Sequence, residues 1–161
     1  FGTGQHETTH MCLKLLETTD LTNRTVFDAG CGSGVLGIAA LKLGASHVKG
    51  CDIEEESIQE AWRNAELNHV KANCDWQNGD VTAEMNQFQI VLANLNIRFL
   101  TTYHSVLTRL PEPPEGRLIV SGFMKSDAEQ VLKLLTTSGQ LALEKQIGMG
   151  EWSAILLRTR L

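Results

Sequence analysis

Short apolar runs alternate with longer amphipathic segments along most of this chain. The apolar runs favour buried strands, and apolar residues at helical spacing favour helices between them. The predicted strands cover residues 25–28, 47–51, 73–76, 88–93, 117–121, 141–147 and 152–158. The predicted helices cover residues 6–18, 35–43, 55–68, 97–110 and 126–136. This alternation predicts an α/β fold in which a mostly parallel, seven-stranded sheet has helices on both faces.

The order of the elements also predicts where a ligand binds. The last two strands have no helix between them, so they are expected to form an antiparallel hairpin at one edge, with Gly148 and Gly150 in the turn. The other strands are separated by helices and should run parallel. Ligands of open α/β sheets bind beyond the carboxyl ends of the strands. The loops that follow the strands therefore hold the candidate functional residues.

The first of these loops is DAGCGSG, at residues 28–34. Its glycines, among them Gly30 and Gly32, allow a sharp turn and a close approach of ligand to main chain. A match to G-x-G-x-x-G that ends at Gly37 leaves a dinucleotide as the alternative, although that motif alone is weak. Asp28 would repel a pyrophosphate but suits an ammonium group, and the loop has no basic residue for phosphate. These features favour S-adenosylmethionine, whose methionine part carries an ammonium group.

Acidic residues follow the next two predicted strands. Asp52 could accept hydrogen bonds from both ribose hydroxyls, a feature that both cofactor classes share. Asp80 could accept from the exocyclic amine of adenine while Val81 covers the ring. Each acid also has a structural alternative: Asp28 could cap a helix or brace the loop, and Asn-Gly-Asp is common turn chemistry.

Composition narrows the class of protein. The chain has 161 residues and a formal net charge of −5, which suits one domain and argues against binding nucleic acid through phosphates. Its four cysteines lack zinc-site spacing and are expected to be reduced, buried thiols, as in a cytosol. The sequence shows no signal-peptide layout and no membrane-spanning run. We therefore expect a cytoplasmic protein without direct nucleic-acid or membrane partners, and the sequence predicts no oligomeric state.

Several segments keep the order and spacing of a known family. They are FGTGQHETT at 1–9, DAGCGSGVLGIAALKLGA at 28–45, Asp52-Ile53, VLANL at 91–95 and Glu151-Trp152. Together they resemble the bacterial methyltransferase of ribosomal protein eleven of the large subunit. The opening F-G-T-G-x-H-x-T-T is more specific than the glycine loop, which many class I methyltransferases share. The resemblance implies a class I methyltransferase fold, Rossmann-like, with S-adenosylmethionine as cofactor and protein amines as substrate.

The resemblance also assigns residues. It implies that Thr9, Gly30, Asp52 and Asn94 bind the cofactor and that Thr3 lines the same pocket. With the residues chosen from the loops, the predicted cofactor site comprises Thr3, Thr9, Asp28, Gly30, Gly32, Asp52, Ile53, Asp80, Val81 and Asn94.

Asn94 is also the predicted catalytic residue. It stands at the carboxyl end of the central strand, where its carbonyl could orient the attacking amine or hold the cofactor. We expect positioning and not base catalysis, because an amide does not titrate near neutral pH. Asn94 could instead cap the next helix, but Asn96 suits that role better.

Residues 1–161 are expected to form the catalytic domain that binds S-adenosylmethionine. Family members carry a separate N-terminal domain that recognises the ribosomal protein, and this sequence opens inside the first motif without it. The expected substrate is a lysine side chain or N-terminal amine of a large-subunit ribosomal protein. The alternatives are a small-molecule methyltransferase, a nicotinamide-linked oxidoreductase and a non-catalytic module that binds the cofactor.

One further motif points to different chemistry. His6-Glu7-Thr8-Thr9-His10 fits H-E-x-x-H, in which two histidines one helical turn apart bind zinc and the glutamate acts as a base. A third ligand is not recognisable downstream, and the match lies inside the opening motif of the family. We therefore predict no metal site.

Overall fold

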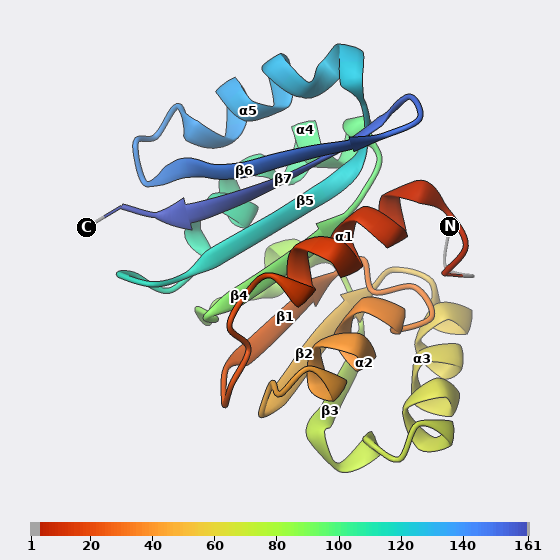
Figure 1. The fold of residues 1–161 in the computed structure, drawn as a ribbon. Helices are drawn as coiled ribbons and strands as arrows, with labels where there is room; N and C mark the ends of the chain where they lie inside the picture. The colour runs from red at the N-terminus through yellow and green to blue at the C-terminus, as the bar shows by residue number, and fades with distance from the viewer. Residues whose placement is uncertain (1–3, 161) are drawn as a thin grey trace.

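The computed structural model describes residues 4–160 as one seven-stranded sheet with helices on both faces (Figure 1). The strand order is β3-β2-β1-β4-β5-β7-β6, in which β7 alone runs opposite to the other six strands. The order reverses between β1 and β4, where a parallel sheet opens a crevice at its carboxyl ends. The strands are β1 (Thr25–Ala29), β2 (His47–Asp52), β3 (Cys74–Asn78), β4 (Ile90–Asn94), β5 (Arg117–Met124), β6 (Leu141–Met149) and β7 (Trp152–Thr159).

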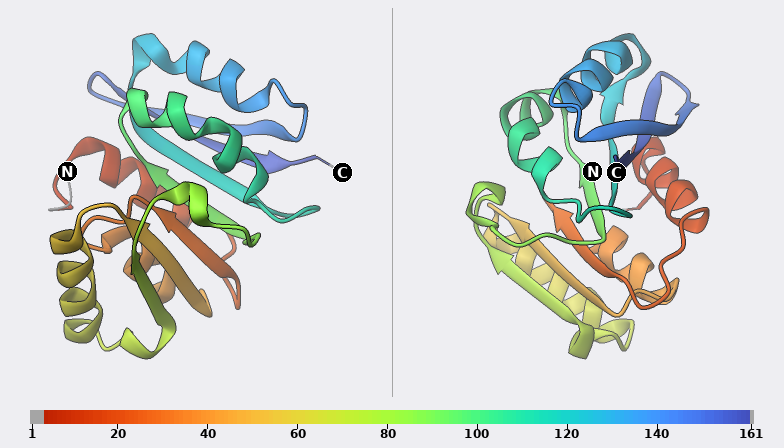
Figure 2. Two further views of the ribbon diagram at one scale, coloured as in Figure 1. Left: turned by 180° about the vertical axis from the view of Figure 1, so that it is seen from behind. Right: turned by 90° about the vertical axis from the view of Figure 1, so that its left-hand side faces the viewer.

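The helices divide between the two faces of the sheet. They are α1 (Glu7–Glu17), α2 (Val35–Lys42), α3 (Glu55–Leu67), α4 (Ile97–Arg109) and α5 (Ala128–Thr136). Helices α1, α2 and α3 cover one face, and α4 and α5 cover the other (Figure 2). Side chains of β4 alternate between the two cores: Ile90 and Leu92 pack with the first group, and Val91 and Ala93 with the second. The central strand is thus buried on both faces, which explains its apolar sequence.

The structure confirms the α/β fold, every predicted element among the described residues and the antiparallel hairpin. β6 is an edge strand and pairs with β7 across a short turn. Some boundaries differ. β5 continues three residues past the predicted end, because a bulge at Gly122 keeps the strand paired with β7. β4 begins at Ile90, since Phe88 makes only an isolated bridge with Pro111.

Two local expectations are wrong. Gly148 lies within β6, where it pairs with Ser153, so that only Gly150 belongs to the turn. The helix predicted from residue 126 begins as a 3-10 turn, Lys125–Asp127, and becomes an α-helix only at Ala128.

The cysteines are buried free thiols, as predicted. Burial, reinforced by the charges of Asp28 and Asp52, raises the pKa of Cys31 and Cys51, the latter to about 11. Burial therefore favours the neutral thiol of both residues at physiological pH. Between residues 4 and 160, no helix has the length and apolar character that crossing a membrane requires.

Candidate functional site

A cavity of about 350 Å³ lies at the carboxyl ends of β1, β2 and β4. We call it the glycine-loop cavity. The topology brings side chains of four separate segments to it, because parallel strands end at the same edge of the sheet. Six predicted site residues line it: Thr9, Asp28, Gly30, Gly32, Asp52 and Asn94.

At Gly32 the main chain itself borders the open space of this cavity. Its φ is +52°, a left-handed conformation that glycine adopts without strain. A Cβ added at Gly32 would meet no heavy atom within 4 Å, so the main chain here borders open space. The Gly32 N–H is already used, because it donates to Asp52 Oδ2 at 2.9 Å. A ligand can therefore approach the bare main chain closely.

Asp28 lies beneath the glycine loop and is only 2% exposed. Its Oδ2 accepts a hydrogen bond from the N–H of Gly37, in the first turn of α2, at 3.1 Å. The residue before that helix, Gly34, has no side chain to cap it, so Asp28 braces the helix from the strand. Burial, aided by the charge of Asp52 and opposed by the Gly37 hydrogen bond, raises the pKa of Asp28 to about 7. The structure therefore shows Asp28 bracing the loop and helix, which was the structural alternative for this residue. That Asp28 also contacts a ligand stays a prediction.

Asp52 joins the second strand to the glycine loop. Its Oδ2 accepts from Gly32 and its Oδ1 accepts from the N–H of Glu54 at 3.0 Å. These two bonds fix the carboxylate at the mouth of the cavity. An ionised carboxylate has about four acceptor positions, so Asp52 can still accept from hydroxyl groups of a ligand.

Asn94 and Thr9, which also line the cavity, are in contact with each other. The Nδ2 of Asn94 donates to the Oγ1 of Thr9 at 3.4 Å, which ties the end of β4 to α1. The Oδ1 of Asn94 is buried and has no hydrogen-bond partner among the described residues. A buried amide oxygen without a partner is costly, so this atom is suited to accept from a bound molecule. Asn96 caps α4 by accepting from the Phe99 N–H, as predicted.

A second cavity of about 220 Å³ adjoins the first and shares Gly30, Asp52 and Glu54 with it. We call it the apolar cavity. The predicted residues Ile53 and Val81 line it, and Val81 is buried. Its remaining lining residues are Cys51, Gly79, Leu95, Phe99 and Tyr103.

The structure does not bring Asp80 to the lining of either cavity. Asp80 Oδ1 accepts from the N–H of Thr82 at 2.8 Å, so the turn role named as its alternative is present. Asp80 Oδ2 accepts from the hydroxyl of Tyr103 at 2.8 Å. Tyr103, which lines the apolar cavity, is thus the residue through which Asp80 connects to it. Thr3 lies outside the described residues.

Sequence reasoning missed Leu95, Phe99 and Tyr103. They lie at the end of β4 and in the first two turns of α4. The rings of Phe99 and Tyr103 are parallel, with their centroids 6.0 Å apart. Their spacing of four residues on a predicted helix was a usable signal, because such residues share one face.

The H-E-x-x-H segment is only partly helical. His6 precedes α1 and caps it, accepting from the Thr8 N–H through Nδ1 at 3.3 Å. Its ring also lies edge-on to Trp152, with 4.9 Å between centroids. In the described part of the chain, no group of three or more His, Cys, Asp or Glu side chains is arranged to hold a metal ion.

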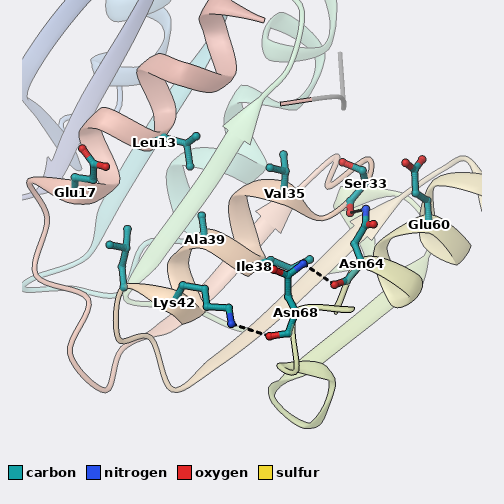
Figure 3. Close-up of a pocket in the computed structure, with 11 residues that line it drawn as sticks. Leu13, Glu17, Ser33, Val35, Ile38, Ala39, Lys42, Glu60, Asn64 and Asn68 are labelled. Atoms are coloured by element: carbon teal, nitrogen blue, oxygen red, sulfur yellow. Dashed lines mark hydrogen bonds between the residues drawn. The ribbon is translucent and has the colours of Figure 1, made fainter. Parts of the chain in front are cut away.

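A larger groove of about 650 Å³ lies on the outer side of α1, α2 and α3 (Figure 3). Several of its polar groups are engaged within the fold: Lys42 Nζ donates to the Asn68 carbonyl at 2.7 Å, and Asn64 Nδ2 donates to the Ser33 carbonyl at 2.9 Å. Size alone therefore does not identify the functional site. The two cavities at the carboxyl ends of the strands hold the predicted residues.

The family model and the relatives that match this chain carry the same name. Residues 1–160 match the family model described as ribosomal protein L11 methyltransferase (PrmA). Proteins of that name from Escherichia coli and Photobacterium profundum are 39% and 40% identical to this chain, each over 96% of it. The match covers 52% of each of those proteins. The chain thus spans about half the length of these curated relatives.

Solved structures confirm the class I methyltransferase fold. A ribosomal protein L11 methylase from Lactobacillus delbrueckii superposes with a TM-score of 0.89 at 26% identity, over 98% of this chain and 81% of that one. An RNA methyltransferase from Salinibacter ruber, in complex with S-adenosyl-L-homocysteine, has a TM-score of 0.74 at 16% identity, over 94% of this chain and 91% of that one. The second likeness shows the fold alone.

Proposed function

Because this chain belongs to the ribosomal protein L11 methyltransferase family, we propose that it transfers methyl groups from S-adenosylmethionine to amines of a ribosomal protein. The observation that carries the proposal is the buried, unpartnered Oδ1 of Asn94, a residue that lines the glycine-loop cavity. An acceptor there suits the N–H of an attacking amine. The finer substrate that we propose is a lysine side chain or N-terminal amine.

The residues present fit the cofactor. Gly32 borders open space that a nucleoside or amino acid can occupy. Asp52 retains free acceptor positions for ribose hydroxyls, and its charge, with that of Glu54, favours a cationic ligand. Ile53 and Val81 provide apolar contact for adenine in the adjoining cavity. We propose that Thr9, Gly30 and Asn94 complete the set, and that Thr3 joins them.

The protein's contribution to the reaction is positioning. Bound S-adenosylmethionine supplies an electrophilic methyl group on a cationic sulfur. Asn94 accepts a hydrogen bond from the neutral amine through Oδ1 and thereby orients its lone pair. Orientation of this kind can lower a barrier by roughly 7–11 kcal/mol when it is complete. Asn94 does not take a proton, because an amide does not titrate near neutral pH. The substrate ammonium loses its proton to water or a nearby acceptor before it attacks as the neutral amine.

We further propose that residues 1–161 act as the catalytic domain. The relatives are about twice as long as the part that matches. We assign recognition of the ribosomal protein to that further length. Transfer to protein amines therefore needs a chain with both parts, whereas cofactor binding needs only the residues described above.

Calorimetry tests the proposal in two steps. The chain should bind S-adenosylhomocysteine and should not bind NAD, since the glycine loop has no basic residue for a pyrophosphate. A full-length protein that includes this chain should then transfer labelled methyl groups to a large-subunit ribosomal protein, and mass spectrometry should place them on amines. Binding of NAD in preference to S-adenosylhomocysteine would overturn the cofactor assignment, and labelling of a small molecule alone would overturn the substrate.

A further inference from the structure

Tyr103 lines the apolar cavity and carries a hydroxyl group to which no role has been assigned. Among the described residues that line this cavity, it has the only side-chain hydroxyl. Tyr103 lies one helical turn after Phe99 on α4, and the two rings are parallel. Its hydroxyl donates to Asp80 Oδ2 at 2.8 Å. The ring of Tyr103 therefore lines the cavity, and the carboxylate of Asp80 holds its hydroxyl in place.

Asp80 determines which way the Tyr103 proton points. Hydrogen bonds from the Thr82 hydroxyl and N–H, together with that from Tyr103, hold the pKa of Asp80 below its ordinary value. The carboxylate raises the pKa of Tyr103, which therefore keeps its proton at neutral pH. An ionised carboxylate only accepts, so the Tyr103 hydroxyl is the donor in this hydrogen bond and its one O–H points to Asp80. The hydroxyl oxygen can then only accept a further hydrogen bond. It is a stronger acceptor because its O–H donates to a charged group.

We propose that Tyr103 is a specificity-determining residue for the adenine base, and that Asp80 is a positioning residue that fixes the Tyr103 hydroxyl as an acceptor. This inference rests on the proposed function, because it takes the apolar cavity as the adenine subsite. The exocyclic amine of adenine donates hydrogen bonds and matches an acceptor. Hypoxanthine has a carbonyl oxygen at that position, and two facing acceptors exclude it.

The arrangement also explains why Asp80 itself does not line the cavity. A carboxylate there would add a third charge to those of Asp52 and Glu54 in a largely apolar space. Tyr103 instead offers a hydrogen-bond acceptor that carries no charge. Its ring lies parallel to that of Phe99 and adds apolar contact.

The test compares the dissociation constants of S-adenosylhomocysteine and S-inosylhomocysteine by calorimetry. The unmodified chain should prefer the adenine compound by about tenfold or more. Tyr103→Phe removes the acceptor and should bring the ratio close to one. Asp80→Asn should lower the ratio as far or invert it: its amide carbonyl takes the Thr82 N–H, its NH₂ donates to Tyr103, and the tyrosine proton is free to meet a carbonyl.

Phe99→Leu is the matched control. It removes the parallel ring but no hydrogen-bonding group, so it should weaken both compounds by the same factor and leave the ratio unchanged. Thermal unfolding of each variant shows that the chain is folded. A folded Tyr103→Phe variant that keeps the original preference would overturn this inference and leave the proposed function intact. A chain that binds neither compound would overturn the proposed function and, with it, the adenine subsite.

Discussion

The two cavities at the edge of the sheet are built in different ways. The glycine-loop cavity is bordered by main chain and by polar side chains that bond inward, such as Asp28 to α2 and Asn94 to Thr9. The apolar cavity is formed by side chains from separate elements, and one of them, Ile53, is 55% exposed. Residues of the first wall also tie strands to helices, whereas an exposed residue of the second, such as Ile53, can change with little effect on the fold.

This difference predicts where substitutions act. Changes at the glycine-loop cavity should alter stability, binding and turnover together, because its residues also hold the fold. Changes at exposed residues of the apolar cavity should alter affinity for the base and little else. If variants of the glycine-loop cavity changed only affinity for the base, or variants of the apolar cavity changed stability and turnover, the two regions would not be distinct.

The largest expected effect is on stability, through Asp28. The pKa of Asp28 is about 7 in the folded protein against an ordinary 3.8. Between about pH 4 and pH 7 the folded state therefore binds more protons than the unfolded state, and the free energy of unfolding falls as pH rises. The isosteric Asp28→Asn variant should gain on the unmodified protein over that window, by roughly 4 kcal/mol at most.

Urea unfolding at about pH 5 and about pH 8 measures this gain. Asp20→Asn is the control, because Asp20 is exposed and hydrogen bonds from Thr22 lower its pKa. Because its pKa lies below 3.8, Asp20 is ionised in both the folded and the unfolded state at these two pH values, so the difference between this variant and the unmodified protein should not change with pH. A pH-independent difference for Asp28→Asn would mean that the buried carboxyl is not titrating in this range.

The next effect is on binding, at Gly32. Valine there would strain a backbone at φ +52° and fill the open space in front of the loop. Affinity for S-adenosylhomocysteine should fall by about 100-fold or more. Gly139→Val is the matched control, since Gly139 also has a positive φ and open surroundings but lies in a distant turn. It should show similar backbone strain with unchanged affinity. Equal losses of affinity in both variants would show that strain, and not the cavity, is responsible.

Asn94→Ala should lower turnover by about tenfold, because the acceptor that orients the amine is lost. The readout is the rate of methyl transfer by the full-length protein at saturating cofactor, with affinity for S-adenosylhomocysteine measured beside it. Asn96→Ala is the control two residues further on. It removes the cap of α4, at a cost of about 1 kcal/mol in stability, and should leave turnover unchanged. Normal turnover in Asn94→Ala would remove this residue from the reaction.

The same division explains what the sequence could predict. Alternating apolar runs and glycines at fixed spacing predict strands, helices and the loop directly, because these are local properties of the chain. Asp28, Gly32 and Asp52 follow from their places at the strand ends. The topology of the sheet then brings them together, and family resemblance adds Thr9 and Asn94.

The apolar cavity was harder to predict from the sequence, because residues that are distant along the chain form its walls. Phe99 and Tyr103 look like any helix face until the fold brings the first turns of α4 to the same cavity as the ends of β1 and β2. The hydrogen bond from Tyr103 to Asp80 joins residues 23 positions apart and has no local signature. Likewise, the carboxylate of Asp28 suggested a ligand from its position, and only the structure shows its hydrogen bond to Gly37.

The smallest effect should come from Ile53. This residue is 55% exposed at the rim of the apolar cavity, so Ile53→Ala removes part of the apolar contact with the base and little of the core. Affinity for S-adenosylhomocysteine should fall by about threefold, as expected for a partly buried side chain, and the unfolding temperature should not change. Leu67→Ala is the matched control, because Leu67 is 69% exposed and lines neither cavity. If both variants bind equally well, adenine does not contact Ile53, and the base occupies some other part of the site.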